Sequence, residues 1–482
     1  MNEEPTLRQR TARSVKWSVV ERLSTQVIYA LTGIILARLI SPSEFGLVGA
    51  VLVFQAFANL FVDSGFASAL IQRKEPTERD YSTVFWFNML MAVGLYVVLW
   101  FCAPLIADWF QGEERLVMLG RVMFLTFILN AAGIVQTNRL VKQMNVKPVA
   151  VANTVGLLIG AGVGIWLAFE RRDAWALVWQ SVVTAGAKSL LLWLMVRWRP
   201  MMVCSLKILR GFFAVGSGIM LQTLLNVIFQ NIYSFFIGHR LGMRPLGYYT
   251  QADKWSKMPT ASLCGVLTQS FLPALSAVQD QPERLGRLCG KMHRATAYVV
   301  FFGFGWLMVA AAPIFHALFG SKWDPAIILF QLLMLRGIMV VLGGLYTNFI
   351  LAVGHSRLLV WSEALRDGAA LLALFACFPW LADPRGLEWM LWGQIAASFI
   401  TLVVALQMAA GCTGRSFWLY VRDLGPYVVV AALALVPAWW LVEVIANPWI
   451  AIVASGVAGC GCYLLLNLRS VIQKDLLSHI KL

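Results

Sequence analysis

Residues 325–352 read PAIILFQLLMLRGIMVVLGGLYTNFILA, a run of 28 residues with one charged side chain, Arg336. An apolar run longer than about 18 residues is typical of a helix that crosses a lipid bilayer. The apolar residues are continuous rather than alternating, so the run does not fit a strand of a membrane β-barrel. It predicts a transmembrane helix with one positive charge near the middle of the bilayer.

The rest of the chain repeats this pattern. Hydrophobic residues make up 59% of the 482 residues and charged residues 13%, with a mean hydropathy of +0.72, whereas about 25% of a soluble chain is charged. We therefore predict an all-α integral membrane protein of about 14 transmembrane helices. Its short loops leave no room for a soluble domain, and no G-x-x-x-x-G-K-[ST] motif is present, which excludes an ABC-type motor. The predicted spans are 15–37, 46–72, 82–107, 117–138, 149–169, 174–197, 212–238, 252–277, 295–319, 325–352, 358–380, 388–410, 424–445 and 449–468.

Lys and Arg residues are distributed unevenly between alternate loops. Of the 39, 24 fall on the side of the N-terminus, counting Lys16 and Arg197 at the ends of their spans, 8 fall in the opposite loops and 7 lie deeper within the spans. Cytoplasmic loops carry the excess of Lys and Arg in membrane proteins. We expect a multi-pass protein of the bacterial inner membrane with both termini in the cytoplasm. Because the basic residues lie in short loops, the net charge of +15 does not indicate nucleic-acid binding.

Four short sequence matches recur in the same order in the two halves of the chain. The matched segments are 45–46 with 246–247, 66–70 with 271–275, 104–110 with 313–319, and 137–138 with 347–348. Because an even number of helices separates the copies, both halves insert with the same orientation, as in a parallel transporter repeat. We assign residues 1–210 to an N-terminal six-helix lobe, 211–411 to a C-terminal six-helix lobe, and 412–482 to helices 13 and 14 and a tail.

Two segments near the N-terminus are similar to a known family. Residues 37–49, ARLISPSEFGLVG, and 63–74, DSGFASALIQRK, resemble the polysaccharide exporters of the MOP superfamily, and most closely the Wzx-like flippases of the colanic-acid-exporter type. Residues 82–86, STVFW, extend the resemblance. Its specific part covers residues 10–145, and the remainder is similar in helix number and repeat. Family members commonly have Asp, a large apolar residue and Gly where this chain has Asp63-Ser64-Gly65.

The resemblance implies a flippase that moves undecaprenyl-diphosphate-linked oligosaccharides from the cytoplasmic to the periplasmic leaflet by alternating access. Such units are assembled into O-antigen, capsule or exopolysaccharide. The implied fold is MOP/MATE-like, a V-shaped pair of six-helix lobes with the substrate between them. The implied partners are the lipid-linked oligosaccharide, the bilayer, and a polysaccharide polymerase and glycosyltransferases. We expect a monomer without a cofactor, with Na⁺ or H⁺ as a coupling ion.

Several predicted spans contain charged residues, each costing about 2.5–3.5 kcal/mol near the bilayer centre on insertion scales. At about 1.5 Å per residue, Arg336 lies roughly 16 Å into its span, Arg22 roughly 10 Å and Arg366 roughly 12 Å. A guanidinium stays charged and binds phosphate oxygens through two parallel hydrogen bonds. We therefore expect intramembrane cations to hold the diphosphate of the substrate. The candidates are Arg336, Arg22, Arg366 and Lys188.

Pairing inside the protein is the alternative role for these charges. Glu21 would then bond to a neighbouring helix, and Arg366 would pair with Glu363 or Asp367 on its own helix. Asp63 has two interpretations: it binds a coupling Na⁺ or H⁺, or it is the buried partner of an arginine.

Two other functions fit parts of the pattern. A multidrug/cation antiporter of the same superfamily would need an acidic cavity, which Arg336 argues against. A polyprenyl-sugar membrane transferase would need catalytic motifs or large soluble loops, and neither is visible. The eight cysteines and five histidines have no metal-site spacing, and no nucleophile–base set is apparent, so we expect neither a metal site nor catalysis. Gly156, Gly160 and Gly164 predict a small-residue face for close helix packing.

Overall fold

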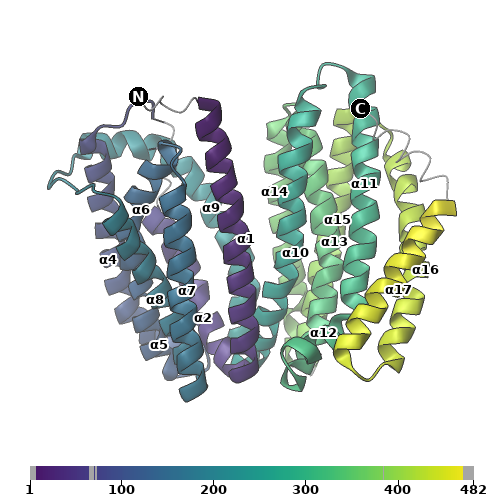
Figure 1. Cartoon of the computed structure of the whole chain (residues 1–482), viewed down its shortest axis with the longest axis horizontal. Coiled ribbons are helices and arrows are strands. Elements are labelled where there is room, and N and C mark those ends of the chain that lie inside the picture. The colour runs from purple at the N-terminus through teal and green to yellow at the C-terminus, as the bar shows by residue number, and fades with distance from the viewer. Residues whose placement is uncertain (1–6, 64–69, 71–72, 384, 470–482) are drawn as a thin grey trace. The chain divides into compact units, whose positions relative to one another are not determined.

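The computed structural model describes residues 7–63, 70, 73–383 and 385–469, and all regular elements in these ranges are helices. The chain forms two compact units, Met1–Gly247 and Tyr248–Leu482, each a bundle of long helices (Figure 1). The first unit contains α1 (Leu7–Leu39), α2 (Pro42–Asp63), α4 (Glu78–Trp109), α5 (Arg115–Met123), α6 (Leu125–Lys142), α7 (Lys147–Glu170), α8 (Trp175–Met195) and α9 (Leu206–Leu241).

Helix α10 (Met243–Ser276) begins in the first unit and continues into the second. The second unit also contains α11 (Pro282–Val309), α12 (Ala311–Leu318), α13 (Asp324–Ala352), α14 (Ser356–Cys377), α15 (Gly386–Thr413), α16 (Phe417–Val444) and α17 (Pro448–Arg469). Two 3₁₀ turns, Ser321–Trp323 and Phe378–Ala382, connect helices in this unit.

Among the described residues, nine helical segments are long and apolar enough to cross a membrane. The number is ten if α11 and α12, which meet at an angle of 58°, form one span. The protein is therefore an all-helical membrane protein, as predicted. Helices α5 and α6 together make one of these spans, Arg115–Lys142, where one continuous helix was predicted. The full number of about 14 spans stays a prediction.

Helices α7 and α8 pack closely along three glycines of α7. A Cβ atom at Gly156 would lie 3.0 Å from the backbone nitrogen of Lys188, and one at Gly160 would lie 2.0 Å from Oγ1 of Thr184. Gly164 faces α8 in the same way, with 2.8 Å to the nearest side-chain atom. Residues four apart lie on one side of a helix, so the glycines form one packing face. This confirms the predicted small-residue face.

We expect Gly160→Leu to destabilise the protein, because the new side chain would occupy the position of Thr184 and the carbonyl of Gln180. Overpacking of this kind costs about 1–3 kcal/mol. Gly162→Leu is the matched control, since a Cβ at Gly162 meets nothing within 4 Å. Thermal unfolding of the purified protein in detergent should show a lower midpoint for Gly160→Leu alone. Equal losses in both variants would contradict this packing.

The first turns of α2 and α10 contact each other through two glycines. A Cβ at Gly46 would lie 1.7 Å from the carbonyl oxygen of Met243, and a Cβ at Gly247 would lie 1.8 Å from that of Pro42. Both distances are far below van der Waals contact, so no side chain larger than hydrogen fits at either position. The two glycines belong to the first matched pair of segments, 45–46 and 246–247. Each copy of that motif thus contributes one glycine to a reciprocal contact.

The C-terminal end of α9 is held by the connection between α4 and α5. Gln111, whose φ is 63°, donates from Nε2 to the carbonyl oxygens of His239 and Arg240, each at 3.2 Å. These are among the carbonyls that a helix end leaves without an intrahelical partner. A Cβ at Gly238 would lie 2.5 Å from the ring of Phe110, so this end of α9 lies directly against the connection. Helix α9 is therefore part of the first unit, although the predicted N-terminal lobe ends at residue 210. That lobe boundary, which is defined by the repeat, stays a prediction.

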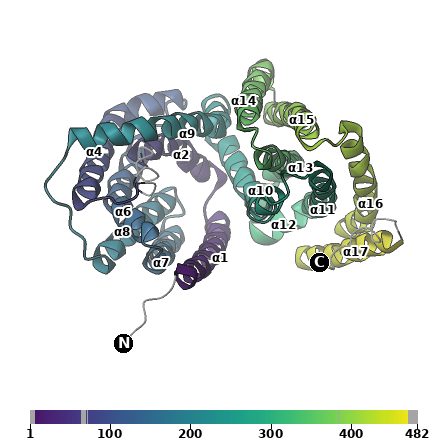
Figure 2. The ribbon, with the colours of Figure 1, turned by 90° about the horizontal axis from the view of Figure 1, so that it is seen from above.

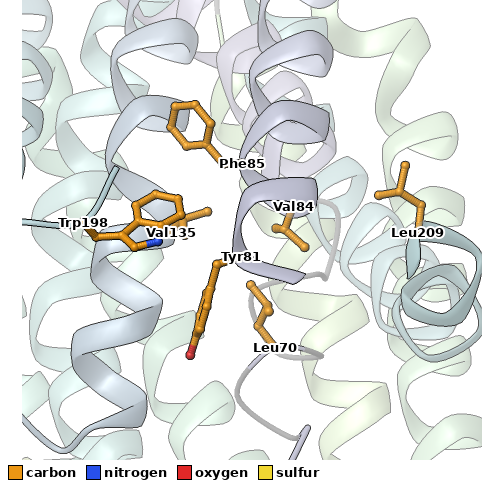
Figure 3. Packing of buried hydrophobic residues seen from close by; sticks show 7 residues of the cluster. All are labelled: Leu70, Tyr81, Val84, Phe85, Val135, Trp198 and Leu209. Carbon is orange, nitrogen blue, oxygen red and sulfur yellow. The ribbon is translucent and has the colours of Figure 1, made fainter. Parts of the chain in front are cut away.

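A cluster of buried hydrophobic residues, aromatic and aliphatic, packs around the N-terminal end of α4 (Figure 3). Trp198 donates from Nε1 to a carboxylate oxygen of Glu78 at 2.6 Å, and Arg139 contacts both oxygens of that carboxylate at 2.9 and 3.0 Å. Buried Trp side chains are usually hydrogen-bonded in this manner. The cluster therefore fastens the segment before α9 to α4 and α6. Its members are Leu70, Tyr81, Val84, Phe85, Val135, Trp198 and Leu209.

Helix α13 lies beside α11 and α15 in the second unit (Figure 2). Tyr346 and Phe349 are fully buried in these contacts. The residues of α13 that keep some exposure recur every three to four positions, so they form one stripe along the helix. Beyond the first turn, the stripe comprises Ile327, Ile328, Gln331, Leu335, Arg336, Met339, Val340, Gly343, Gly344, Thr347 and Leu351.

Candidate functional site

Arg336 lies on the accessible stripe of α13, roughly 18 Å from the start of the helix at about 1.5 Å per residue. Its Nε donates to Oγ of Ser398 on α15 at 3.3 Å. No ion pair of Arg336 with a carboxylate occurs in the part of the chain that the structure describes. A guanidinium has five N–H donors, so most of them remain for another partner.

A second charged group lies in the first unit, and we call it the Glu21 cluster. It consists of Glu21 of α1, Asn153 of α7 and Lys188 of α8, and we include Arg22 because it follows Glu21 on α1. Nδ2 of Asn153 donates to Oε1 of Glu21, so Glu21 bonds to a neighbouring helix, one of the two alternatives from the sequence. Lys188 interacts electrostatically with Glu21. Both residues are half-buried, whereas Arg22 is exposed.

Helix packing places the members of the Glu21 cluster at one level. The ammonium of Lys147, at the start of α7, lies 5.4 Å from the ring centre of Trp17 on α1. One to two turns further along both helices, Glu21 meets Asn153. Gly156 is three residues beyond Asn153 on the same side of α7, and its missing side chain admits the backbone of Lys188. The cluster thus depends on the glycine face of α7.

The remaining predicted site residues do not join either group. Nε of Arg366 pairs with Oδ1 of Asp367 at 3.2 Å, and the arginine side chain is 51% exposed. This is the pairing that the sequence offered as an alternative. Exposed ion pairs contribute only about 0–1 kcal/mol to stability, so this contact does not decide whether Arg366 also binds substrate. That role stays a prediction. The side chain of Asp63, at the end of α2, lies outside the described residues.

Other charges within the helices have local partners. Lys257 pairs with Asp253, one turn earlier on α10, at 2.6 Å. Arg121 stacks over the ring of Trp100 at 4.6 Å and donates to the carbonyl oxygen of that residue. These contacts account for the charges without a substrate.

Sequence reasoning missed a buried polar group that joins α11, α13 and α16. His293 is fully buried. Its Nε2 lies 3.1 Å from the carbonyl oxygen of Tyr420, which can only accept, so Nε2–H is the donor. Nδ1 is then free to accept from the hydroxyl of Tyr346 at 3.4 Å. Because both ring nitrogens are satisfied by neutral groups, His293 acts as a packing residue.

A charged bridge lies next to His293. Oδ2 of Asp423 on α16 accepts from Arg294 of α11 at 3.2 Å and from Arg415, which precedes α16. The guanidinium of Arg415 occupies the space that a side chain at Gly290 would need. No sequence pattern indicates the pairing of Arg294 with Asp423, because 129 positions separate them. Arg415 is only eight positions from Asp423, but no motif marks that pair either.

Comparison with solved structures defines the fold class. The chain matches the lipid II flippase MurJ in an inward closed conformation with a TM-score of 0.71 at 12% identity, covering 96% of this chain and 100% of that one. An inward-facing MATE-family multidrug transporter of the MOP superfamily matches with a TM-score of 0.61 at 14% identity, covering 83% and 94%. At such identities the similarity establishes the fold alone, a MurJ/MATE-like helical fold.

Sequence comparison then assigns the family. A family model described as "Polysaccharide biosynthesis protein" matches residues 35–328. The chain belongs to this polysaccharide biosynthesis family, in agreement with the resemblance of segments 37–49 and 63–74. It is therefore a multi-pass membrane protein of a polysaccharide biosynthesis family.

Named bacterial relatives resemble the chain over most of its length. The teichuronic acid biosynthesis protein TuaB of Bacillus subtilis (strain 168) is 25% identical over 90% of this chain and 89% of its own. The succinoglycan biosynthesis transport protein ExoT of Rhizobium meliloti (strain 1021) is 27% identical over 75% and 73%. The lipopolysaccharide biosynthesis protein WzxC of Escherichia coli (strain K12) is 24% identical over 72% and 71%.

Proposed function

We propose that this protein is a flippase for undecaprenyl-diphosphate-linked oligosaccharide units, moving them from the cytoplasmic to the periplasmic leaflet of the inner membrane. In this proposal the chain has 14 spans, both termini lie in the cytoplasm, and transport proceeds by alternating access. The polysaccharide biosynthesis family to which the chain belongs supports this function. The single observation that carries it is the state of Arg336, a guanidinium near the middle of α13 without a carboxylate partner among the described residues.

The substrate explains why such a charge is kept. A mid-membrane arginine is costly unless it serves a polar pathway or a partner. The diphosphate of the lipid carrier provides several anionic oxygens, which match the planar donors of a guanidinium. Lys188 and Arg22 of the Glu21 cluster are the candidate ligands in the first unit, and Arg336 is the candidate in the second. An exporter of cationic drugs would gain nothing from Arg336, so we keep the antiporter only as the outcome of a failed test.

Deletion of the gene tests this function directly. We expect lipid-linked oligosaccharide to accumulate on the cytoplasmic side while surface polysaccharide disappears, because the unit is made but not moved. Mass spectrometry of extracted polyprenyl lipids measures the accumulation, and expression of the protein from a plasmid should reverse it. Normal surface polysaccharide in the deletion strain, together with increased sensitivity to cationic drugs, would support the antiporter instead.

A further inference from the structure

The Glu21 cluster places a carboxylate where an anionic substrate would bind. We propose that Glu21 is an internal competitor for the diphosphate: it balances the charge of Lys188 while the site is empty, and a phosphate group takes over that role when it binds Lys188 and Arg22. This inference rests on the proposed function and deepens it, because it names the residue that controls release of the headgroup.

The hydrogen bonding of Glu21 leaves Lys188 available to another anion. Its direct hydrogen bond goes to Asn153, a neutral amide on α7. Lys188 interacts with it electrostatically, but the two form no ion pair at contact distance among the described residues. The ammonium is therefore balanced in charge without being saturated with acceptors. A phosphate oxygen at contact distance would interact more strongly than the more distant carboxylate, because the Coulomb energy falls with separation.

The charges around Glu21 favour an anion over an empty site. Lys188 and Arg22 carry two positive charges, against one negative charge on Glu21. Arg22 follows Glu21 on α1, so its side chain points about 100° away around the helix axis, and it is exposed. Asn153 holds Glu21 against α7. In the proposal a diphosphate binds the two cations while Asn153 retains the carboxylate.

An internal competitor has a clear advantage for a transporter. A site with two uncompensated cations would bind a diphosphate tightly and release it slowly, since affinity differences appear mainly in the dissociation rate. A nearby carboxylate lowers the affinity for the diphosphate. It again balances the charge of Lys188 when the lipid leaves. Glu21 is thus a positioning residue, and Lys188 and Arg22 are the substrate contacts.

Binding of diphosphate to the purified full-length protein in detergent tests the proposal. The probes are inorganic pyrophosphate and undecaprenyl diphosphate without sugar, which separate the headgroup from the lipid. Glu21→Gln keeps the size of the side chain and its acceptor for Asn153 but removes the charge, so we expect about tenfold tighter binding. Lys188→Met should weaken binding at least about tenfold and abolish the gain in the double variant. Glu443→Gln is the control, because it changes the net charge equally at an exposed position at the far end of α16.

Three results would overturn the proposal. In the first, wild-type protein binds neither probe. In the second, Glu21→Gln binds the probes no more tightly than Glu443→Gln. In the third, the tighter binding of Glu21→Gln persists when Lys188→Met is added. If Glu21→Gln does not fold, Asn153→Leu replaces it: Glu21 then loses its holding bond and turns to Lys188, and binding should weaken. If the binding test contradicts the role of Glu21 while wild-type protein restores polysaccharide in the deletion strain, the proposed function stands and only the competitor role is wrong.

Discussion

Replacing Arg336 by alanine should reduce surface polysaccharide to the level of the deletion strain while leaving the protein folded in the membrane. Loss of a desolvated charge partner costs about 2–5 kcal/mol of binding free energy. Among the residues that the structure describes, Arg336 makes one hydrogen bond, to Ser398, so its removal leaves none of their buried carboxylates without a partner. Export is measured by polysaccharide staining or mass spectrometry, and folding by membrane abundance and thermal unfolding.

Two further variants separate the role of Arg336 from its surroundings. Arg336→Lys should retain part of the export, because an ammonium keeps the charge but lacks the planar pair of donors. Ser398→Ala should have a small effect, since it removes only the bond that orients the guanidinium. Full export by Arg336→Ala would exclude this residue from the mechanism and remove the main support for the proposed function.

The reciprocal glycine contact leads to the second large effect. Gly46→Ala would place a methyl group 1.7 Å from the carbonyl oxygen of Met243, and a backbone atom cannot move aside as a side-chain end can. We expect a loss of at least about 3 kcal/mol, the upper range for overpacking. The readout is the yield of monodisperse protein together with its unfolding midpoint in detergent.

Gly94→Ala is the control for that substitution. A Cβ at Gly94 in α4 meets nothing within 4 Å, so alanine should be neutral or should stabilise by up to about 1 kcal/mol through its higher helix propensity. If Gly46→Ala is as stable as Gly94→Ala, the first turns of α2 and α10 are not in contact in the folded protein.

Much of the fold followed from the length of the apolar runs. Hydropathy locates the part of a helix that lies in lipid, so the run at 325–352 appears as α13 (Asp324–Ala352). Hydropathy does not detect the part of a helix that extends beyond the lipid. For this reason the predicted span begins at 295, whereas α11 begins at Pro282. Hydropathy also does not detect bends, such as the 58° turn between α11 and α12, where the run stays apolar.

The candidate site was harder to predict, for a physical reason. Arg366 and Asp367 are neighbours in sequence, so local reasoning suggested their pairing. Glu21 and Asn153 lie on different helices, 132 residues apart, and their contact depends on how α1 packs against α7. A single sequence states the depth of a charge in the membrane but not which side of its helix faces a partner.

The contact between Gly46 and Met243 also bears on how the protein is made. Translation at about 5–20 residues per second places residue 247 about 10–40 s behind residue 46. During that interval α2 is already inserted, yet Gly46 and Pro42 in its first turn lack their contacts with Met243 and Gly247. A nascent chain that stops between residues 210 and 247 would carry every helix of the first repeat and still lack the surface that completes it. The ribosome must therefore begin the second repeat before the first can finish folding.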